Sequence, residues 1–72
     1  MEFLKVIFCQ ERSVLVNGKR SGKTNLVIEI EAGTHTISLA PPWDFKPEKI
    51  AVVLEADQTG PLSPKEVTFE TV

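Results

Sequence analysis

Apolar residues recur at every second position through most of this chain, which is the period of a β-strand and not of an α-helix. The residues of this pattern that we expect to face a core are Leu26, Ile28 and Ile30, then Ile37 and Leu39, then Ile50, Val52 and Leu54, and finally Val67 and Phe69. Such strands bury one face and offer the other to water, as in antiparallel sheets. No long segment has the apolar spacing of three and four residues that a helix needs, so we predict an all-β chain.

Turn residues separate these alternating segments. Asn17-Gly18 and Ala32-Gly33 are typical of tight turns, and Pro41-Pro42 stops a strand because proline cannot donate to a strand ladder. The predicted strands cover residues 2–9, 12–17, 25–31, 34–40, 48–55 and 66–71. About six short, mostly antiparallel strands with Gly and Pro turns predict one small β-sandwich, close to the immunoglobulin-like class, over residues 1–72.

The size of the chain limits its core. A domain of 72 residues buries only roughly 60% of the surface that its unfolded chain exposes. Domains this small commonly add disulfides, a metal or a partner. Cys9 is the only cysteine and His35 the only histidine, which allows no internal disulfide and no zinc site, and we expect no cofactor. The domain must therefore be stabilised by good packing of its core or by association with a partner.

Charge and hydropathy argue against two classes of partner. The net charge of −2 is too small to attract nucleic acid or anionic lipid. Lys19, Arg20 and Lys23 form a basic cluster in the first long turn, but no aromatic residue lies between residues 9 and 42 to stack on bases. No apolar run approaches the roughly 20 residues that cross a bilayer, and the N-terminus lacks a signal-peptide pattern. We therefore expect a cytoplasmic protein without a membrane span, or an extracytoplasmic one if the chain was cut from a longer protein.

The N-terminal run is apolar on both faces. Leu4, Val6 and Phe8 point one way, while Phe3, Ile7 and Cys9 point the other. A strand of this kind is usually covered on both faces. Two accounts follow: the strand lies in the middle of the fold, or its second face meets another copy or another domain.

Two aromatic residues follow the diproline, in the segment Trp43-Asp44-Phe45. Exposed aromatic side chains in loops commonly mark binding surfaces. Trp43 and Phe45 can contact a protein partner or stack on a sugar ring. The alternative is that both cap the open end of the core.

Short turn and strand segments follow one another over roughly residues 12–55, namely Val14-Leu15-Val16-Asn17-Gly18-Lys19, Gly22-Lys23-Thr24, Ala32-Gly33-Thr34-His35-Thr36-Ile37-Ser38-Leu39 and Trp43-Asp44-Phe45-Lys46-Pro47. In these segments the chain resembles the PEGA domain family. It departs from the family at Asn25, where proline is common, and at Trp43-Asp44-Phe45, which lacks the usual glycine. The resemblance implies a small β-sandwich that commonly serves as an accessory or surface-displayed module of larger proteins, and it brings no active site.

No group of residues predicts catalysis. Cys9 and His35 each fall inside a predicted strand, where we expect a packed thiol and a solvent-facing imidazole. Glu29 and Glu31 share the polar face of one strand, without an apolar wall to raise a pKa. Gly22-Lys23-Thr24 precedes a strand and not the helix that a phosphate loop needs, so we interpret it as a turn.

We therefore predict a non-enzymatic interaction or structural accessory module that binds a protein partner or associates with itself. The predicted contact residues are Trp43, Asp44, Phe45, Phe3 and Ile7. The alternative is a small carbohydrate- or ligand-binding module that uses Trp43 and Phe45.

Overall fold

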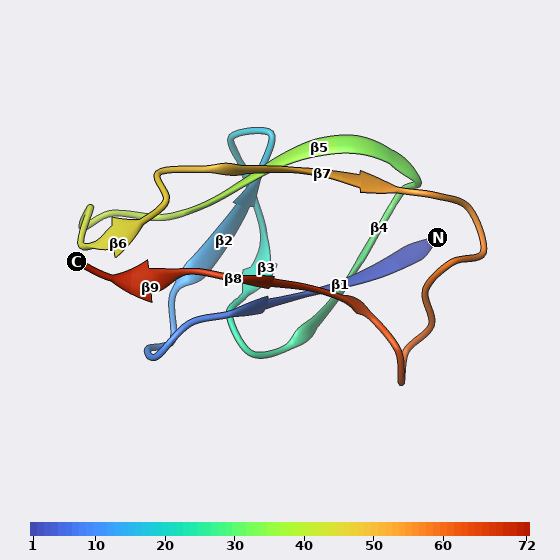
Figure 1. Ribbon diagram of the computed structural model, residues 1–72, viewed down its shortest axis with the longest axis horizontal. Coiled ribbons are helices and arrows are strands. Elements are labelled where there is room, and N and C mark those ends of the chain that lie inside the picture. The colour runs from blue at the N-terminus through green and yellow to red at the C-terminus, as the bar shows by residue number, and fades with distance from the viewer.

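The computed structural model describes residues 1–72 and contains only strands (Figure 1). The nine strands are β1 (Glu2–Ile7), β2 (Ser13–Val16), β3 (Lys19–Lys23), β4 (Val27–Ile30), β5 (Gly33–Leu39), β6 (Phe45–Lys46), β7 (Ile50–Leu54), β8 (Lys65–Thr68) and β9 (Glu70–Thr71). The prediction of an all-β chain is confirmed. None of the chain forms a helix that is long and apolar enough to cross a membrane.

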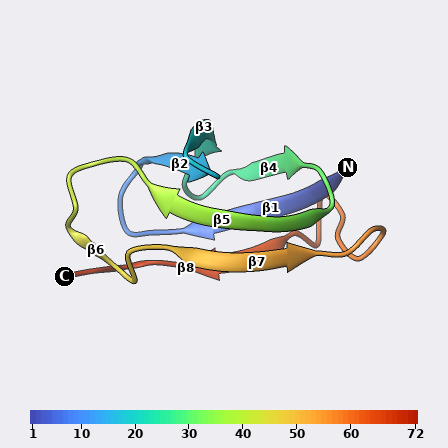
Figure 2. The same ribbon diagram turned by 90° about the horizontal axis from the view of Figure 1, so that it is seen from above.

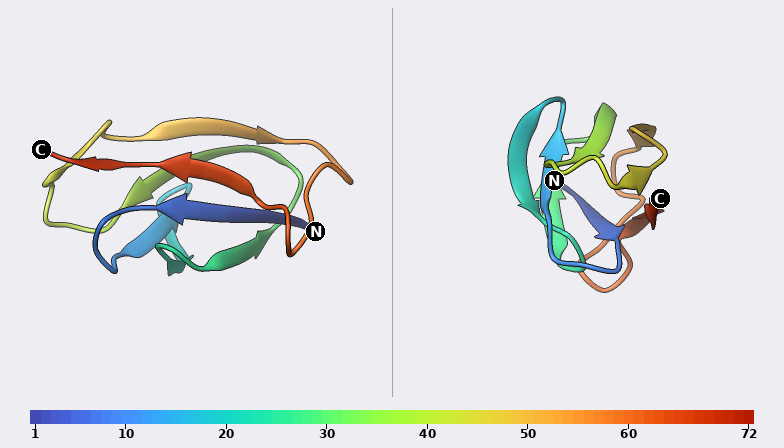
Figure 3. Two further views of the ribbon diagram at one scale, coloured as in Figure 1. Left: turned by 60° about the horizontal axis from the view of Figure 1, so that its bottom comes forward. Right: turned by 90° about the vertical axis from the view of Figure 1, so that its left-hand side faces the viewer.

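The strands form two main sheets and a short ribbon. One sheet has the order β4-β1-β8, the other β3-β2-β5-β7, and β6 pairs with β9. All pairs are antiparallel except β1 with β8, whose arrows point the same way in Figure 3, left. The two sheets lie over one another along the long axis of a molecule measuring 34 × 21 × 17 Å (Figure 2).

A single apolar cluster fills the space between the sheets. Its 14 buried members are Leu4, Val6, Phe8, Val14, Val16, Ile28, Ile30, Ile37, Leu39, Phe45, Val52, Leu54, Val67 and Phe69. Most of them alternate with exposed or half-buried residues along their strands, as the period of two predicts. Every main strand except β3 contributes to this core.

Leu26 is the one predicted core residue that the structure places outside, with 59% of its surface exposed. Asn25 has a φ of 65°, and its side-chain amide donates to the Phe8 carbonyl (2.8 Å). This turn ends just before β4 begins, so Thr24 takes the buried position and the inward alternation starts at Ile28. The alternation in the sequence carried no sign of this turn.

β3 is a strand that the apolar pattern did not predict, because none of its five residues is apolar or buried. It forms because Asn17 (φ 53°) and Gly18 (φ 84°) make a two-residue turn with both φ angles positive, which folds the chain back onto β2. The basic cluster therefore lies on an edge strand and not in a long turn. Gly22 lies in β3 without a positive φ, so its interpretation as a turn glycine is wrong.

β1 is the central strand of its sheet, between β4 and β8. Leu4, Val6 and Phe8 face the core, whereas Phe3 and Ile7 are half-buried on the outer face. The first account is correct in that β1 is central in its sheet, but the outer face of β1 is only partly buried. Cys9 lies beyond the end of β1 and is exposed, so the prediction of a packed thiol is wrong.

The two ends of the molecule are closed in different ways. At one end the predicted strand 66–71 divides into β8 and β9, and β9 pairs with β6. At the other end the buried Glu2 carboxylate accepts hydrogen bonds from Asp57 N–H (3.0 Å) and from the Thr59 hydroxyl (2.8 Å). Between these ends β7 and β8 remain unpaired with each other.

Candidate functional site

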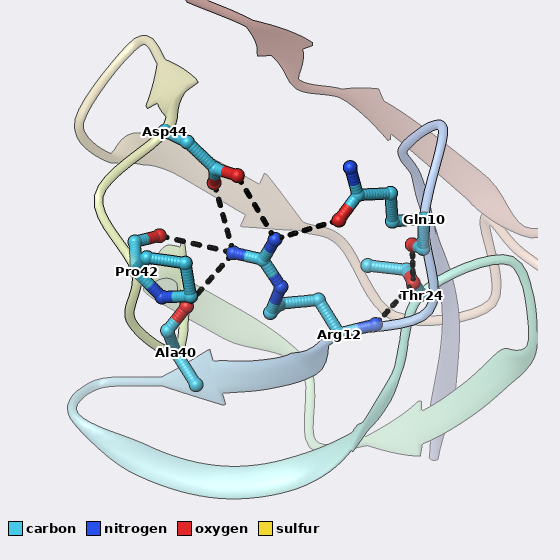
Figure 4. A network of polar contacts seen from close by, with 6 residues as sticks. All are labelled: Gln10, Arg12, Thr24, Ala40, Pro42 and Asp44. Atoms are coloured by element: carbon cyan, nitrogen blue, oxygen red, sulfur yellow. Dashed lines mark hydrogen bonds and ion pairs between the residues drawn. The ribbon is translucent and has the colours of Figure 1, made fainter.

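Arg12 connects the loop after β1 to the loop before β6. Its guanidinium donates to both carboxylate oxygens of Asp44 (3.0 and 3.2 Å), to the Ala40 and Pro42 carbonyls (3.3 and 3.0 Å) and to Gln10 Oε1 (3.0 Å), as Figure 4 shows. A planar guanidinium fits such a two-pronged carboxylate contact. One side chain thus fixes the start and the end of the segment that carries Trp43.

Thr24 and Phe8 also fix the position of Arg12, from the side that faces the core. Its backbone N–H donates to the Thr24 hydroxyl (2.9 Å), which in turn donates to the Gln10 carbonyl (2.7 Å). The guanidinium carbon lies 5.4 Å from the centre of the Phe8 ring, within the range of a cation–π contact. Only 10% of the Arg12 side chain is exposed, against 41% for Asp44.

The ion pair changes the acidity of both partners in the expected direction. The hydrogen bond from Arg12, with its positive charge, holds the pKa of Asp44 below its ordinary value. The same hydrogen bond raises the pKa of Arg12. Both groups therefore stay charged over the physiological range. We call the ion pair of Arg12 with Asp44, together with the bonds from Arg12 to Ala40 and Pro42, the Arg12 clamp.

Trp43 and Phe45, which the sequence analysis grouped as contact residues, have different environments. Phe45 is buried, and its ring makes edge contacts with Phe8 (6.3 Å between centroids) and Phe69 (5.6 Å). Its ring therefore belongs to the core and is closed to a partner. Trp43 is 67% exposed and lies tilted on Phe45, with 5.8 Å between the ring centroids.

Phe3 and Ile7 lie on a different surface, the outer face of the β4-β1-β8 sheet. Both are half-buried, and Val27 on the neighbouring β4 is 44% exposed on the same side. The five predicted contact residues therefore do not form one site. Trp43 and Asp44 lie in the loop before β6, Phe45 is in the core, and Phe3 and Ile7 are on a sheet face.

The residues weighed for catalysis are not brought together. The half-buried His35 ring lies 3.2 Å from the Asn17 amide nitrogen and 2.7 Å from the Glu31 carbonyl oxygen, far along the chain from the exposed Cys9. Since the Asn17 amide donates to Nδ1, the ring proton is assigned to Nε2, and this N–H donates to the Glu31 carbonyl. No group of three His, Cys, Asp or Glu side chains is close enough to hold a metal ion.

Arg12 is the residue of this site that sequence reasoning missed. No role was assigned to Arg12 from the sequence. Arg12 and Asp44 are 32 positions apart, and no spacing rule connects a residue before one strand with a loop residue two hairpins later. Two opposite charges 32 positions apart are too common in any sequence to predict an ion pair.

Comparison with protein families identified one match. The family model of the PEGA domain matches residues 10–65, which contain the resembling segments of residues 12–55. Comparisons with curated proteins and with solved structures gave no match.

Proposed function

Because this chain belongs to the PEGA domain family, an accessory or structural module, we propose that it acts without catalysis by binding a protein partner through Trp43. The observation that supports this proposal is an exposed tryptophan on a loop with both ends fixed. Trp43 rests on Phe45, and the Arg12 clamp holds Pro42 and Asp44 on either side of it. A large aromatic side chain that is ordered before binding loses little entropy on contact, and such residues dominate protein interfaces.

The surroundings of Trp43 favour a protein over a sugar. A carbohydrate site needs polar side chains beside the aromatic ring to bind the hydroxyl groups. Here the guanidinium of Arg12, the carboxylate of Asp44 and the amide oxygen of Gln10 are already bonded to one another. Trp43 therefore offers mainly apolar contact area, beside charged groups that are already paired.

A second observation, on a different surface, favours self-association. The outer face of β1 carries the half-buried Phe3 and Ile7, and Val27 on the neighbouring β4 is 44% exposed on the same side. If this face pairs two copies, sedimentation equilibrium will show a dimer, and Ile7→Lys will return it to a monomer. If the protein is a monomer at all concentrations, self-association is excluded and the partner is a different protein.

The proposal is tested by affinity capture from lysate of the source cells, with the wild-type domain compared with Trp43→Ala. We expect at least one protein to be captured by the wild type and depleted about tenfold or more with the variant, which corresponds to roughly 1.4 kcal/mol of binding energy. Leu62→Ala is the matched control, because Leu62 is a large apolar residue that is 97% exposed in another loop.

Two outcomes would contradict the proposal. Captured proteins that respond equally to both substitutions would mean that Trp43 carries no specific contact. Binding to an array of glycans that is lost with Trp43→Ala would instead identify a carbohydrate module.

A further inference from the structure

A groove runs between β7 and β8. Each is an edge strand of one of the two sheets, and the two strands do not pair with each other. Residues 50–53 and 65–68 line its central part, which has a volume of about 480 Å³. Smaller hollows continue it at both ends and share Val53, Lys65 and Thr68 with the central part. The floor is apolar, since Val52 and Val67 are buried core residues and Ile50 packs against them.

The wall formed by β7 offers free main-chain groups to this groove. On β5, Thr36 accepts from Asn17 N–H and Ala40 donates to Ser13, so the even-numbered residues of β5 bond to β2. Hydrogen-bonded positions alternate along an antiparallel strand, and the odd-numbered residues of β5 therefore bond to β7. Their partners are Ile50, Val52 and Leu54. The N–H and C=O groups of Ala51 and Val53 consequently point away from β5, into the groove.

The wall formed by β8 has the same property. Phe69 N–H donates to the Ile7 carbonyl (2.9 Å), which assigns residues 65, 67 and 69 to the bonds with β1. The main-chain groups of Glu66 and Thr68 therefore face the groove. No backbone hydrogen bond connects β7 with β8.

The chain protects its other strand edges with charge, but not β7. Proteins commonly place charged residues on exposed edges to prevent pairing with other chains. β3 carries three basic residues, β4 carries Glu29, and β8 carries Lys65 and Glu66. β7 has five consecutive uncharged residues, and Val53 is 62% exposed. An edge of this kind is a template for a further strand.

From these observations we propose that the groove binds an extended segment of a partner polypeptide, which adds as a strand along β7. β7 and β8 run in opposite directions (Figure 1), so the added strand is antiparallel to one wall and parallel to the other. Its main chain bonds to Ala51 and Val53, and on the far side to Glu66 and Thr68. The segment has alternating side chains, apolar ones toward Val52 and Val67 and polar ones toward solvent.

The position of β8 decides between a single segment and a second folded copy. The edge strand of another folded domain carries its own sheet, which would meet β8 before reaching β7. A single extended segment is only one strand wide. The groove therefore selects a linear segment, such as a loop, a linker or a terminus of the partner.

This inference builds on the proposed role in binding a protein but uses a surface separate from Trp43. Trp43 lies in the loop before β6, and the groove is lined by β7 and β8. The two can fail independently, because a variant in one surface leaves the other intact.

The test is selection of a surface-displayed library of random linear segments, each roughly ten residues long, against the intact domain and against Ala51→Pro. Proline is tolerated on an edge strand where the N–H points away from the sheet. Ala51→Pro removes one groove-facing donor and leaves the β5 hydrogen bonds in place. We expect selected segments with alternating apolar residues whose affinity falls about tenfold or more with Ala51→Pro.

Glu29→Pro is the matched control, since Glu29 occupies the equivalent outward position on the β4 edge. If Ala51→Pro fails to fold, the segments are synthesised with N-methyl groups at alternate residues, which blocks pairing without changing the domain. Hydrogen exchange then locates the segment, with slower exchange expected at the amides of Ala51, Val53, Glu66 and Thr68. The proposal is overturned if the selection yields no segment, if N-methylation leaves affinity unchanged, or if the protected amides lie elsewhere.

Discussion

Glycine is required at position 22 because the Ile28 side chain lies against it, and not because of its own backbone angles. A Cβ atom at this position would lie 2.7 Å from Ile28 Cγ1 and 2.9 Å from Ile28 Cδ1. Ile28 is a buried core residue, and its β-branched side chain has little freedom to turn away. A methyl group here therefore has to push β3 away from Ile28 or move the Ile28 side chain.

We predict that Gly22→Ala lowers the free energy of unfolding by about 1–3 kcal/mol, the usual cost of overpacking. Gly60→Ala is the control, because a Cβ there meets nothing within 4 Å and the backbone angle suits alanine. Its effect should lie between zero and a gain of about 1 kcal/mol. Urea unfolding measures both, and equal stabilities for the two variants would refute the packing argument.

Arg12 and Trp43 give a second prediction at this scale. Arg12→Lys keeps the positive charge but loses the two-pronged contact with Asp44, because an ammonium group cannot bond to both carboxylate oxygens and two carbonyls in one plane. We expect faster motion of the Trp43 indole in NMR relaxation and a red shift in its fluorescence. Lys23→Met should change neither, since the Lys23–Glu11 ion pair is exposed on both sides.

At the level of the strands, the apolar pattern predicted the six strands that carry alternating apolar residues. Six predicted strands correspond to β1, β2, β4, β5, β7 and β8, and the alternation correctly assigned Ile37, Leu39 and Val67 to the core. The pattern could not predict β3, β6 or β9. These strands are too short or too polar to show an alternating apolar pattern, since β3 and β9 bury no side chain and β6 buries only Phe45.

The candidate site was predictable only in part for the same reason. An exposed aromatic after a diproline was a local signal, and Trp43 is indeed exposed. The burial of Phe45 depends on Phe8 and Phe69, which come from the two ends of the chain. Contacts between residues this far apart have no local spacing that a single sequence could reveal.

The turn before β3 carries the third prediction. Gly18 has a φ of 84°, where a β-branched residue costs about 1–2 kcal/mol. Because β3 buries no side chain, the turn and the main-chain pairing with β2 are what hold it in place. Gly18→Val should therefore release β3 locally. Hydrogen exchange should accelerate at the β2–β3 amides and much less at the β5–β7 amides, whereas equal acceleration in both would mean that β3 is part of the cooperative core.

On the scale of the whole molecule, two carboxylates hold the two ends of the fold. Glu2 is 3% exposed, and the Thr59 hydroxyl, followed by the Asp57 amide, holds its pKa below the ordinary value of 4.5. Asp44 connects the segments at the other end, where the hydrogen bond from Arg12 lowers its pKa from the ordinary 3.8. Each therefore stabilises the folded state in its ionised form, while the core between them has no titratable group.

The stability of the protein should consequently fall in acid. A carboxylate with a lowered folded pKa contributes its full stabilisation above its unfolded pKa and loses it as the pH falls through the folded value. We expect the melting temperature to be level near neutral pH and to decrease as the pH falls below about 4.5. In the double variant Glu2→Gln with Asp44→Asn, the protein should melt at a lower temperature at neutral pH, and the decrease in acid should be much shallower. If the double variant loses stability in acid as steeply as the wild type, carboxylates other than Glu2 and Asp44 govern the acid response.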